Sequence, residues 1–260
     1  MNVIFGFPQH ENFDTALDLY MTIKKYNNNP IVLYSSNEGL GHSFEKLTKI
    51  KSKRVYTWGH IHNFVFDMVE ELSNYKYDYY VNLDSDVLFA NYGFEKIFCE
   101  PFDFTIEHTK DEKHDWYHGR ILLENIDLYE GILSDLKLKR KDKKIVGSIF
   151  ATCVFSKKAI EFLEQILPIL ERSESYIKFM NLPLQGFAFD EVIIFNLLKD
   201  AGFTSKYIRP NPLETIKIDA WQYEEIKPIE TKDLGIIYHK INRDISDSAR
   251  RELLNKIDLN

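Results

Sequence analysis

Hydrophobic positions in the first part of the chain alternate between a strand-like and a helix-like spacing. Apolar runs at residues 3–7, 31–35 and 54–58 are typical of buried strands, whereas residues 13–26 and 62–73 place their apolar side chains on one helical face. Parallel strands need crossover connections, which helices usually supply. The alternation therefore predicts an α/β fold of the Rossmann type, with a mostly parallel sheet and helices on both faces.

The rest of the chain is less regular but still predicts strands. Residues 103–107 and 147–155 have the composition of strands, and a late strand over 234–238 leads into His239. No internal repeat and no low-complexity linker interrupts the chain. We therefore expect one domain.

Two later helices carry recognisable end signals. Ser156 is placed to cap a helix that starts at Lys157, and Pro168 should kink or end it. A second helix over residues 190–201 is followed by Gly202, which suits a left-handed helix end.

The clearest chemical signal follows the apolar run Tyr79 to Leu83, where the chain continues as Asp84-Ser85-Asp86. Side chains alternate along an extended strand, so both carboxylates should leave its end on the same side. Carboxylate oxygens suit Mg²⁺ or Mn²⁺, and the carboxyl ends of interior strands are where open α/β sheets bind ligands. The motif predicts a cation site for nucleotide chemistry.

The same three residues also fit an ordinary turn, because Asp and Ser side chains bond readily to their own backbone. The apolar residues on both sides of the motif favour the cation site, since two buried charges without a counter-ion would be costly. An EF-hand calcium loop is excluded, because Leu88 stands where a third oxygen ligand belongs and the turn glycine is missing.

Composition agrees with an enzyme-sized globular protein. The 260 residues are 44% hydrophobic and 14% aromatic, and the net charge of -7 gives no indication of nucleic-acid binding. No apolar run has the length of a membrane span, so we expect a cytoplasmic protein. Cys99 and Cys153 lie in apolar sequence and are expected to be buried, reduced thiols.

In this order of segments the chain resembles nucleotide-sugar glycosyltransferases of the GT-A fold. The resemblance rests on the α/β N-terminal part, Asp84-Ser85-Asp86, the segment 147–159, Phe189-Asp190-Glu191-Val192 and Tyr238-His239-Lys240. It implies a single GT-A domain, with a nucleotide-sugar-binding half over about residues 1–95 and a smaller acceptor-side half over about residues 96–260. It also implies transfer of a sugar from a nucleotide-sugar donor, with UDP favoured, to a hydroxyl of a glycan or a lipid-linked sugar, as in polysaccharide synthesis.

The resemblance also implies roles for individual residues at the donor. Asp84 and Asp86 would hold Mn²⁺ or Mg²⁺ together with the donor diphosphate, and Ser85 lies between them. Asp86 is the expected principal metal ligand, because a cation that bridges diphosphate oxygens stabilises the leaving group. Asp84 would contact the metal through water or hold the donor ribose or sugar. His239 would complete the metal shell, although a lone histidine at a strand end is more often structural. Lys240 would meet the diphosphate, although an exposed lysine is the default.

The acceptor hydroxyl needs a base, and the adjacent Asp190 and Glu191 are the candidates. Neighbouring helical positions point about 100° apart, so both cannot face one site. We expect Asp190 to cap the helix and Glu191 to act as the base of an inverting reaction. Acidic residues are also favoured at helix starts for structural reasons alone, so a purely structural pair is the alternative.

Three further segments carry weaker signals. Residues 58–63, which include His62, lie at a strand-to-helix turn that would either contact the donor phosphates or form an ordinary turn. Residues 114–120 have the aromatic and polar mix of either a sugar-binding loop or a surface loop. The basic run 137–144 suits an anionic acceptor, peripheral contact at an inner membrane surface, or plain solvation.

Other functions fit the sequence less well. A sugar-phosphate nucleotidyltransferase should have a glycine-rich loop after its first strand, which Gly6-Phe7-Pro8-Gln9 does not supply. A haloacid-dehalogenase-type phosphatase normally carries its Asp-x-Asp near the start of the chain. A non-catalytic carbohydrate-binding protein remains the alternative if the metal site is degenerate.

Overall fold

The computed structural model describes residues 1–9, 13–36, 47–56, 59–110, 116–148, 151–183, 186–208, 235–239 and 241–257. Within these ranges a seven-stranded sheet has the strand order β10-β6-β9-β4-β1-β2-β3. Its strands are β1 (Val3–Pro8), β2 (Ile31–Ser36), β3 (Leu47–Lys51), β4 (Tyr79–Leu83), β6 (Phe104–Ile106), β9 (Thr152–Ser156) and β10 (Ser205–Tyr207). All neighbours pair in parallel except β9, which runs antiparallel to β4 and β6. The predicted mostly parallel sheet is confirmed.

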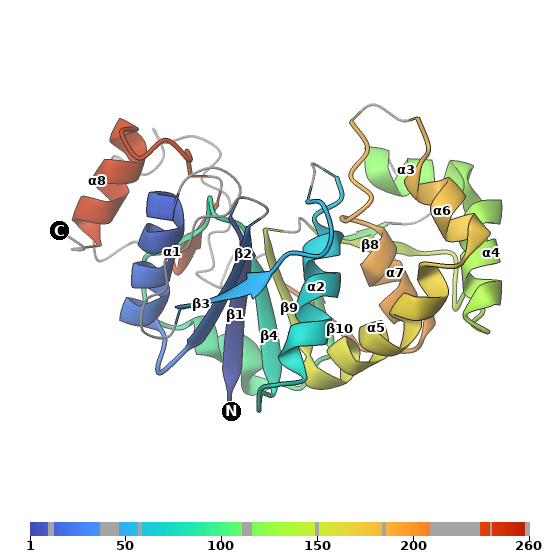
Figure 1. Cartoon of the computed structure of the whole chain (residues 1–260), viewed down its shortest axis with the longest axis horizontal. Helices are drawn as coiled ribbons and strands as arrows, with labels where there is room; N and C mark the ends of the chain where they lie inside the picture. The colour runs from blue at the N-terminus through green and yellow to red at the C-terminus, as the bar shows by residue number, and fades with distance from the viewer. Residues whose placement is uncertain are drawn as a thin grey trace.

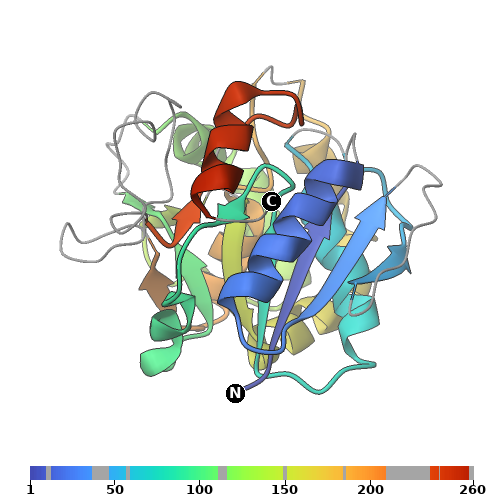
Figure 2. The same cartoon turned by 90° about the vertical axis from the view of Figure 1, so that its left-hand side faces the viewer.

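Helices cover both faces of this sheet (Figure 1). One face carries α1 (Phe13–Tyr26) and α8 (Ser248–Lys256), which lie side by side in Figures 1 and 2. The other face carries α2 (His62–Leu72), α5 (Lys157–Leu170) and α7 (Ile193–Asp200), with α3 (Tyr117–Glu124), α4 (Ile126–Asp135) and α6 (Glu174–Met180) beyond them.

The core divides by sheet face, as the alternation of side chains along a strand requires. Ile4 belongs to the cluster with α2, α5 and α7, whereas Phe5 and Phe7 belong to the cluster with α1 and α8. Both clusters draw on residues from early and late in the chain. The division into two halves near residue 95 stays a prediction.

Two short antiparallel pairs complete the described fold. β5 (Leu88–Phe89) pairs with β11 (Ile237–Tyr238), and β7 (His108–Lys110) pairs with β8 (Ile145–Gly147). The short 3-10 helix η1 (Phe94–Cys99) follows β5. The first pair matters for function, because it brings the late segment that contains His239 back to the end of β4.

Several predicted elements need correction. The third strand is Leu47–Lys51, and residues 54–56 of the predicted strand 54–58 lie outside it, with Arg54 in an ion pair with the buried Asp67 carboxylate at 2.5 Å. Residues 57 and 58 lie outside the described residues. The predicted strand over 147–155 is two strands, β8 and β9, which belong to different sheets. Cys99 is exposed and Cys153 is buried, and both are free thiols.

The helix ends also differ in part from the prediction. Ser156 caps α5 as expected, because its Oγ accepts the amide of Ala159 at 3.2 Å. Pro168 lies inside α5, which continues to Leu170. The helix expected from Asp190 begins at Ile193, so Asp190 does not cap it. Gly202 has φ +92°, the predicted left-handed conformation.

Candidate active site

Asp84, Ser85 and Asp86 form a tight turn at the carboxyl end of β4, an interior strand between β1 and β9. The Asp84 amide donates to the Ala151 carbonyl at 3.0 Å, which ties the turn to β9. Asp84 Oδ1 accepts the amide of Ser85 at 2.6 Å and its hydroxyl at 3.3 Å. The motif is therefore both a turn and a pair of carboxylates, and Ser85 orients Asp84.

The other oxygen of Asp84 shares a cationic partner with Asp86. Arg243 Nη2 lies 2.9 Å from Asp84 Oδ2 and 3.3 Å from Asp86 Oδ2. The Asp84 side chain is 17% exposed and that of Asp86 only 4%. The two carboxylates converge, but on a guanidinium nitrogen, and the divalent cation that the sequence suggested between them stays a prediction.

His239 follows β11 and reaches Asp86 from the other side. Its Nε2 lies 3.5 Å from Asp86 Oδ1, and the Ile241 amide donates to the Asp86 carbonyl at 2.8 Å. The structure thus brings together the three residues that the sequence singled out for the metal. Lys240 lies outside the described residues.

The donor set suits a divalent cation in its chemistry, since carboxylate oxygens and an imidazole nitrogen are common Mn²⁺ ligands. The protein side chains alone do not form a complete metal-binding site. Within the described ranges, no three His, Cys, Asp or Glu side chains are grouped closely enough to hold a metal ion. Asp84 and Asp86 fit the metal through the oxygens that face Arg243. The role of His239 as a ligand stays a prediction.

Other polar groups lie at the same end of the sheet, beside the carboxyl ends of β1 and β4. Gln9 follows β1 and Thr152 pairs with Leu83, and both side chains are buried. Gln9 Oε1 and Thr152 Oγ1 have no hydrogen-bond partner among the described residues. Buried polar atoms are nearly always satisfied in native proteins, so these two are candidates to contact a ligand.

Glu107 is a further carboxylate at this edge that the sequence reasoning missed. It follows β6, which runs parallel to β4 because both are antiparallel to β9. Its side chain is buried, and burial together with this carboxylate raises the pKa of the Cys153 thiol. The signal was available, because a carboxylate at the end of a predicted strand is what marked Asp84.

Asp190 and Glu191 occupy the segment before α7 and have different surroundings. The Asp190 carboxylate is buried and accepts the amides of Ile61 at 3.0 Å and Glu191 at 3.0 Å. Burial raises the pKa of Asp190 to about 6, against the opposing effect of these hydrogen bonds. The Asp190 carboxylate therefore joins its own segment to the start of α2, and its role in catalysis stays a prediction.

Glu191 is the accessible member of the pair, with 22% of its side chain exposed. Its Oε2 lies 3.6 Å from His118 Nε2, and its carbonyl accepts the Ser148 amide at 3.2 Å. His118 Nδ1 accepts the Ala188 amide at 3.1 Å, and burial lowers the pKa of His118. His118, at the start of α3, belongs to the segment 114–120 in which the sequence suggested a sugar-binding loop.

The chain itself limits how far Glu191 lies from the carboxylate pair. Ser148 bonds to Glu191, and Ala151 bonds to Asp84. Three peptide units separate Ser148 from Ala151, so their Cα atoms are at most about 11 Å apart. A short segment of chain therefore links the backbone of Glu191 to the Asp84–Asp86 turn.

His62 does not lie at this site. It is fully buried inside α2, and its Nε2 is 3.2 Å from the Tyr176 hydroxyl. Burial lowers the pKa of His62 to about 3, so its ring is neutral. The expected contact with the donor is not supported, because the core encloses this side chain.

The basic run 137–144 is anchored at two points. Lys199 Nζ contacts Asp142 at 3.0 Å, and the Lys141 amide donates to Asp200 at 3.1 Å. Several of its basic side chains are exposed, including Lys139, Lys141 and Lys143. Among the helices of the described residues, none combines the length and hydrophobicity needed to span a bilayer.

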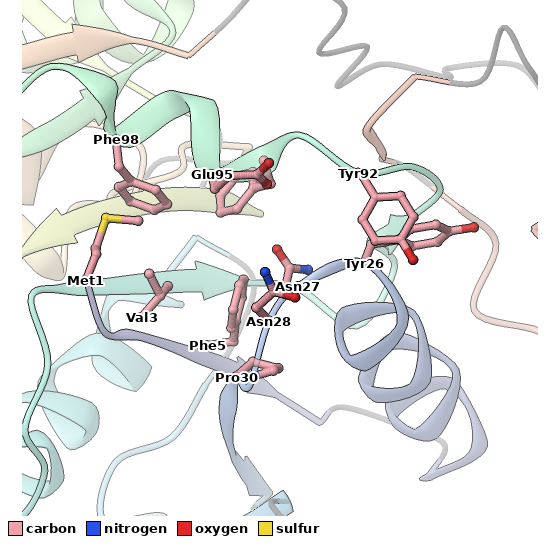
Figure 3. Close-up of a pocket in the computed structure, with 11 residues that line it drawn as sticks. Met1, Val3, Phe5, Tyr26, Asn27, Asn28, Pro30, Tyr92, Glu95 and Phe98 are labelled. Atoms are coloured by element: carbon pink, nitrogen blue, oxygen red, sulfur yellow. The ribbon is translucent and has the colours of Figure 1, made fainter.

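A pocket of about 220 Å³ lies at the opposite end of the sheet, beside the amino end of β1, and contains none of the predicted site residues. Figure 3 shows it at the amino end of β1, between Val3, Tyr26, Tyr92 and Phe98. Its lining has no metal-binding pair, so the carboxyl edge remains the candidate active site.

Comparison with known proteins finds similarity in structure but no match in sequence. No family model matches this chain, and no curated protein matches it. Among solved structures it is similar to galactosyltransferase LgtC with donor and acceptor sugar analogues, with a TM-score of 0.50 and 11% identity over 98% of this chain and 95% of that one. An active-site mutant of LgtC matches with a TM-score of 0.51 and 12% identity over 97% and 95% of the two chains.

A third similar structure is the glycosyltransferase GlyE of Streptococcus pneumoniae TIGR4, with a TM-score of 0.50 and 12% identity. There the match covers 100% of this chain and 61% of GlyE. At such low identity the likeness establishes the fold. The chain has a GT-A fold. The predicted fold class is thereby confirmed.

Arg243 is the main site residue that sequence reasoning missed. It lies in the polar stretch Asn242-Arg243-Asp244, which has neither a strand nor a helix period. Only the return of β11 to the end of β4 places it beside the carboxylates, so no local signal could have identified it.

Proposed function

We propose that this protein is a glycosyltransferase that moves a sugar from a nucleotide-sugar donor to a hydroxyl group of an acceptor. The observation that carries the proposal is the pair Asp84 and Asp86, which leave an interior strand of a GT-A fold and meet at one positive nitrogen. Two of the solved structures that this chain resembles in fold are a galactosyltransferase with donor and acceptor sugar analogues and a glycosyltransferase. The proposed donor carries UDP, and the proposed acceptor is a glycan or a lipid-linked sugar, as in polysaccharide synthesis.

Asp84 and Asp86 would hold Mn²⁺ or Mg²⁺ through their Oδ2 atoms, with His239 beside Asp86. A divalent cation supplies charge stabilisation to the diphosphate as the bond to the sugar breaks. Ser85 keeps Asp84 in position through two hydrogen bonds to its other oxygen. In this proposal Lys240 also binds the diphosphate.

Glu191 would take the proton from the acceptor hydroxyl. It is the exposed carboxylate of its segment, whereas both oxygens of Asp190 already accept backbone amides. A base that activates the acceptor directly implies a single displacement, which inverts the configuration at the anomeric carbon. The anomeric configuration of the product therefore tests this role.

The deciding experiment is a panel of nucleotide sugars with UDP, GDP, CDP, ADP and dTDP leaving groups, incubated with Mn²⁺ or with EDTA. We expect Mn²⁺-dependent release of one nucleoside diphosphate and a matching rise in melting temperature. Asp86→Asn serves as the control without the principal ligand, and Asp142→Asn as the control for a distant surface carboxylate. If the parent releases no nucleoside diphosphate and none shifts its melting temperature with Mn²⁺, the proposal is rejected.

Two further assays separate the alternative functions, one with free sugars and one with a nucleoside triphosphate and a sugar phosphate. A carbohydrate-binding protein would respond to free sugars without releasing a nucleoside diphosphate. A nucleotidyltransferase would instead consume a nucleoside triphosphate and a sugar phosphate, with release of pyrophosphate.

A further inference from the structure

Arg243 contacts the two carboxylates through a single atom. Its Nη2 is within hydrogen-bond distance of Asp84 Oδ2 at 2.9 Å and within ion-pair distance of Asp86 Oδ2 at 3.3 Å. These are the oxygens that the proposed function gives to the metal. A guanidinium and a divalent cation cannot both occupy this position, because like charges at contact distance repel strongly.

The backbone around Arg243 is held from both sides. The Ile241 amide donates to the Asp86 carbonyl at 2.8 Å, and the Asn242 carbonyl accepts Arg250 Nη1 at 3.1 Å. Arg250 is itself fully buried and pairs with Asp18 at 2.7 Å. The loop therefore directs the guanidinium at the carboxylates, and a substitution at Arg243 leaves these anchors in place.

The burial of the partners explains why a counter-ion matters here. Asp86 is 4% exposed, and two neighbouring carboxylates in such surroundings repel each other. The Arg243 side chain is 32% exposed, so solvent reaches it. It can leave the pair by rotation of its own side chain, without unfolding of the loop.

We propose that Arg243 is a built-in counter-ion of the Asp84–Asp86 pair, which a divalent cation must displace, and that Arg243 thereby sets the metal affinity of the site. The inference rests on the proposed metal site. When the divalent cation binds, its positive charge replaces that of the Arg243 guanidinium at this position. Metal binding then costs the Arg243 contacts, which lowers the apparent affinity.

The test is direct binding of Mn²⁺ alone, measured from the electron paramagnetic resonance signal of free Mn²⁺ during titration. Arg243→Gln should bind Mn²⁺ up to about tenfold more tightly than the parent, and a tenfold change corresponds to ~1.4 kcal/mol. Arg243→Lys keeps the charge and should remain close to the parent. Arg251→Gln, an exposed arginine in the same C-terminal segment, should leave the affinity unchanged.

A second readout uses thermal stability in the absence of substrate. In EDTA, Arg243→Gln should melt about 2 to 4 °C below the parent for each kcal/mol of lost counter-ion stabilisation. Saturating Mn²⁺ should remove that difference, because both proteins then have the same charge at the carboxylates.

The outcomes separate this inference from the proposed function. Equal or weaker Mn²⁺ binding by Arg243→Gln, with Mn²⁺-dependent release of nucleoside diphosphate intact in the parent, overturns the inference alone. Binding by Arg243→Gln but not by the parent supports it in its strongest form. If no folded variant binds Mn²⁺, the inference fails together with the metal site of the proposed function.

Discussion

His118 presents a neutral N–H group to Glu191. The Ala188 amide donates to His118 Nδ1 at 3.1 Å, so the ring proton is assigned to Nε2, which lies 3.6 Å from Glu191 Oε2. Burial lowers the pKa of His118, which keeps the ring uncharged at neutral pH. A cation at this distance would weaken Glu191 as a base, whereas a neutral ring leaves the carboxylate able to accept a proton.

The first prediction concerns Glu191 as the base. Glu191→Gln keeps the size of the side chain but cannot take a proton, so turnover should fall by about 10² to 10⁴. Donor affinity and melting temperature should stay close to those of the parent. Steady-state kinetics and a melting curve with nucleotide check both parts.

Asp190→Asn is the matched comparison at the neighbouring position. Each oxygen of Asp190 accepts one amide, and an asparagine has only one acceptor oxygen, so this variant should lose about 1 to 3 kcal/mol of stability. Near-parent turnover in Glu191→Gln would show that the carboxylate is not the base, and the inverting assignment would be withdrawn with it.

The elements that the sequence predicted well are those fixed by local pattern. α1 and β4 follow apolar runs of the proper period, and the Ser156 hydroxyl at the start of α5 is a local capping signal. The sequence also identified the Asp84–Asp86 pair, but for a different geometric reason, because the two carboxylates converge through a turn after β4 rather than along an extended strand.

The parts that the sequence did not predict depend on contacts between distant segments. β3 is an edge strand in which Leu47 and Ile50 are buried while Thr48 and Lys51 are exposed, so it lacks a continuous apolar run. The break between β8 and β9 follows Gly147, where any larger side chain would meet the Trp116 ring. Arg243 reaches its partners across 159 residues of sequence. None of these relationships is encoded in a local period.

The second prediction concerns the pH dependence of His118. Because the pKa of this group is lowered, protonation occurs only as the pH falls below its ordinary value of 6.5. The charged ring should then weaken Glu191 as a base, and kcat/KM should decline on the acid side. His118→Gln places an amide near Glu191 that does not titrate, so its activity should persist to lower pH. If kcat/KM of the variant declines over the same acidic pH range as that of the parent, a group other than His118 controls the decline.

The third prediction concerns stability in acid. The pKa of His62 is lowered from 6.5 to about 3, so the unfolded chain binds a proton that the native state does not, and stability is lost as the pH falls below 6.5. At pH 4.5 the loss from this residue should be about 2 to 3 kcal/mol relative to pH 7. Urea unfolding at both pH values measures it.

His62→Gln should remove most of that acid-dependent loss, since its amide can still meet the Tyr176 hydroxyl without titrating. His60→Gln is the control, because His60 is only half-buried. If His62→Gln and the parent lose equal stability between pH 7 and pH 4.5, the core histidine is not responsible.

The fourth prediction concerns the docking of α8. Arg250 is fully buried and donates to Asp18 at 2.7 Å and to the Thr15 carbonyl at 3.2 Å, both on α1. Arg250→Met leaves these acceptors without their donor and should cost about 3 kcal/mol. The exposed Arg251→Met should change stability by less than about 0.5 kcal/mol. Equal unfolding free energies for the two variants would contradict this account of how α8 is held.

The last prediction concerns Asp86 and the nucleotide. A bound nucleoside diphosphate stabilises the native state by mass action, by about 2.7 kcal/mol when the ligand is present at ~100 times its Kd. For the parent we expect this stabilisation with UDP and Mn²⁺ together and little with UDP in EDTA, because the cation joins the diphosphate to the carboxylates.

Asp86→Asn keeps the shape of the side chain and the backbone bond from Ile241 but removes the buried charge. Its melting temperature in EDTA should stay near that of the parent, since Arg243 retains Asp84 as a partner, while the Mn²⁺-dependent gain with UDP should disappear. A full gain in Asp86→Asn would mean that the nucleotide binds away from the Asp84–Asp86 pair, and the site would then have to be sought elsewhere at the carboxyl ends of the strands, where Gln9, Thr152 and Glu107 are further buried polar residues.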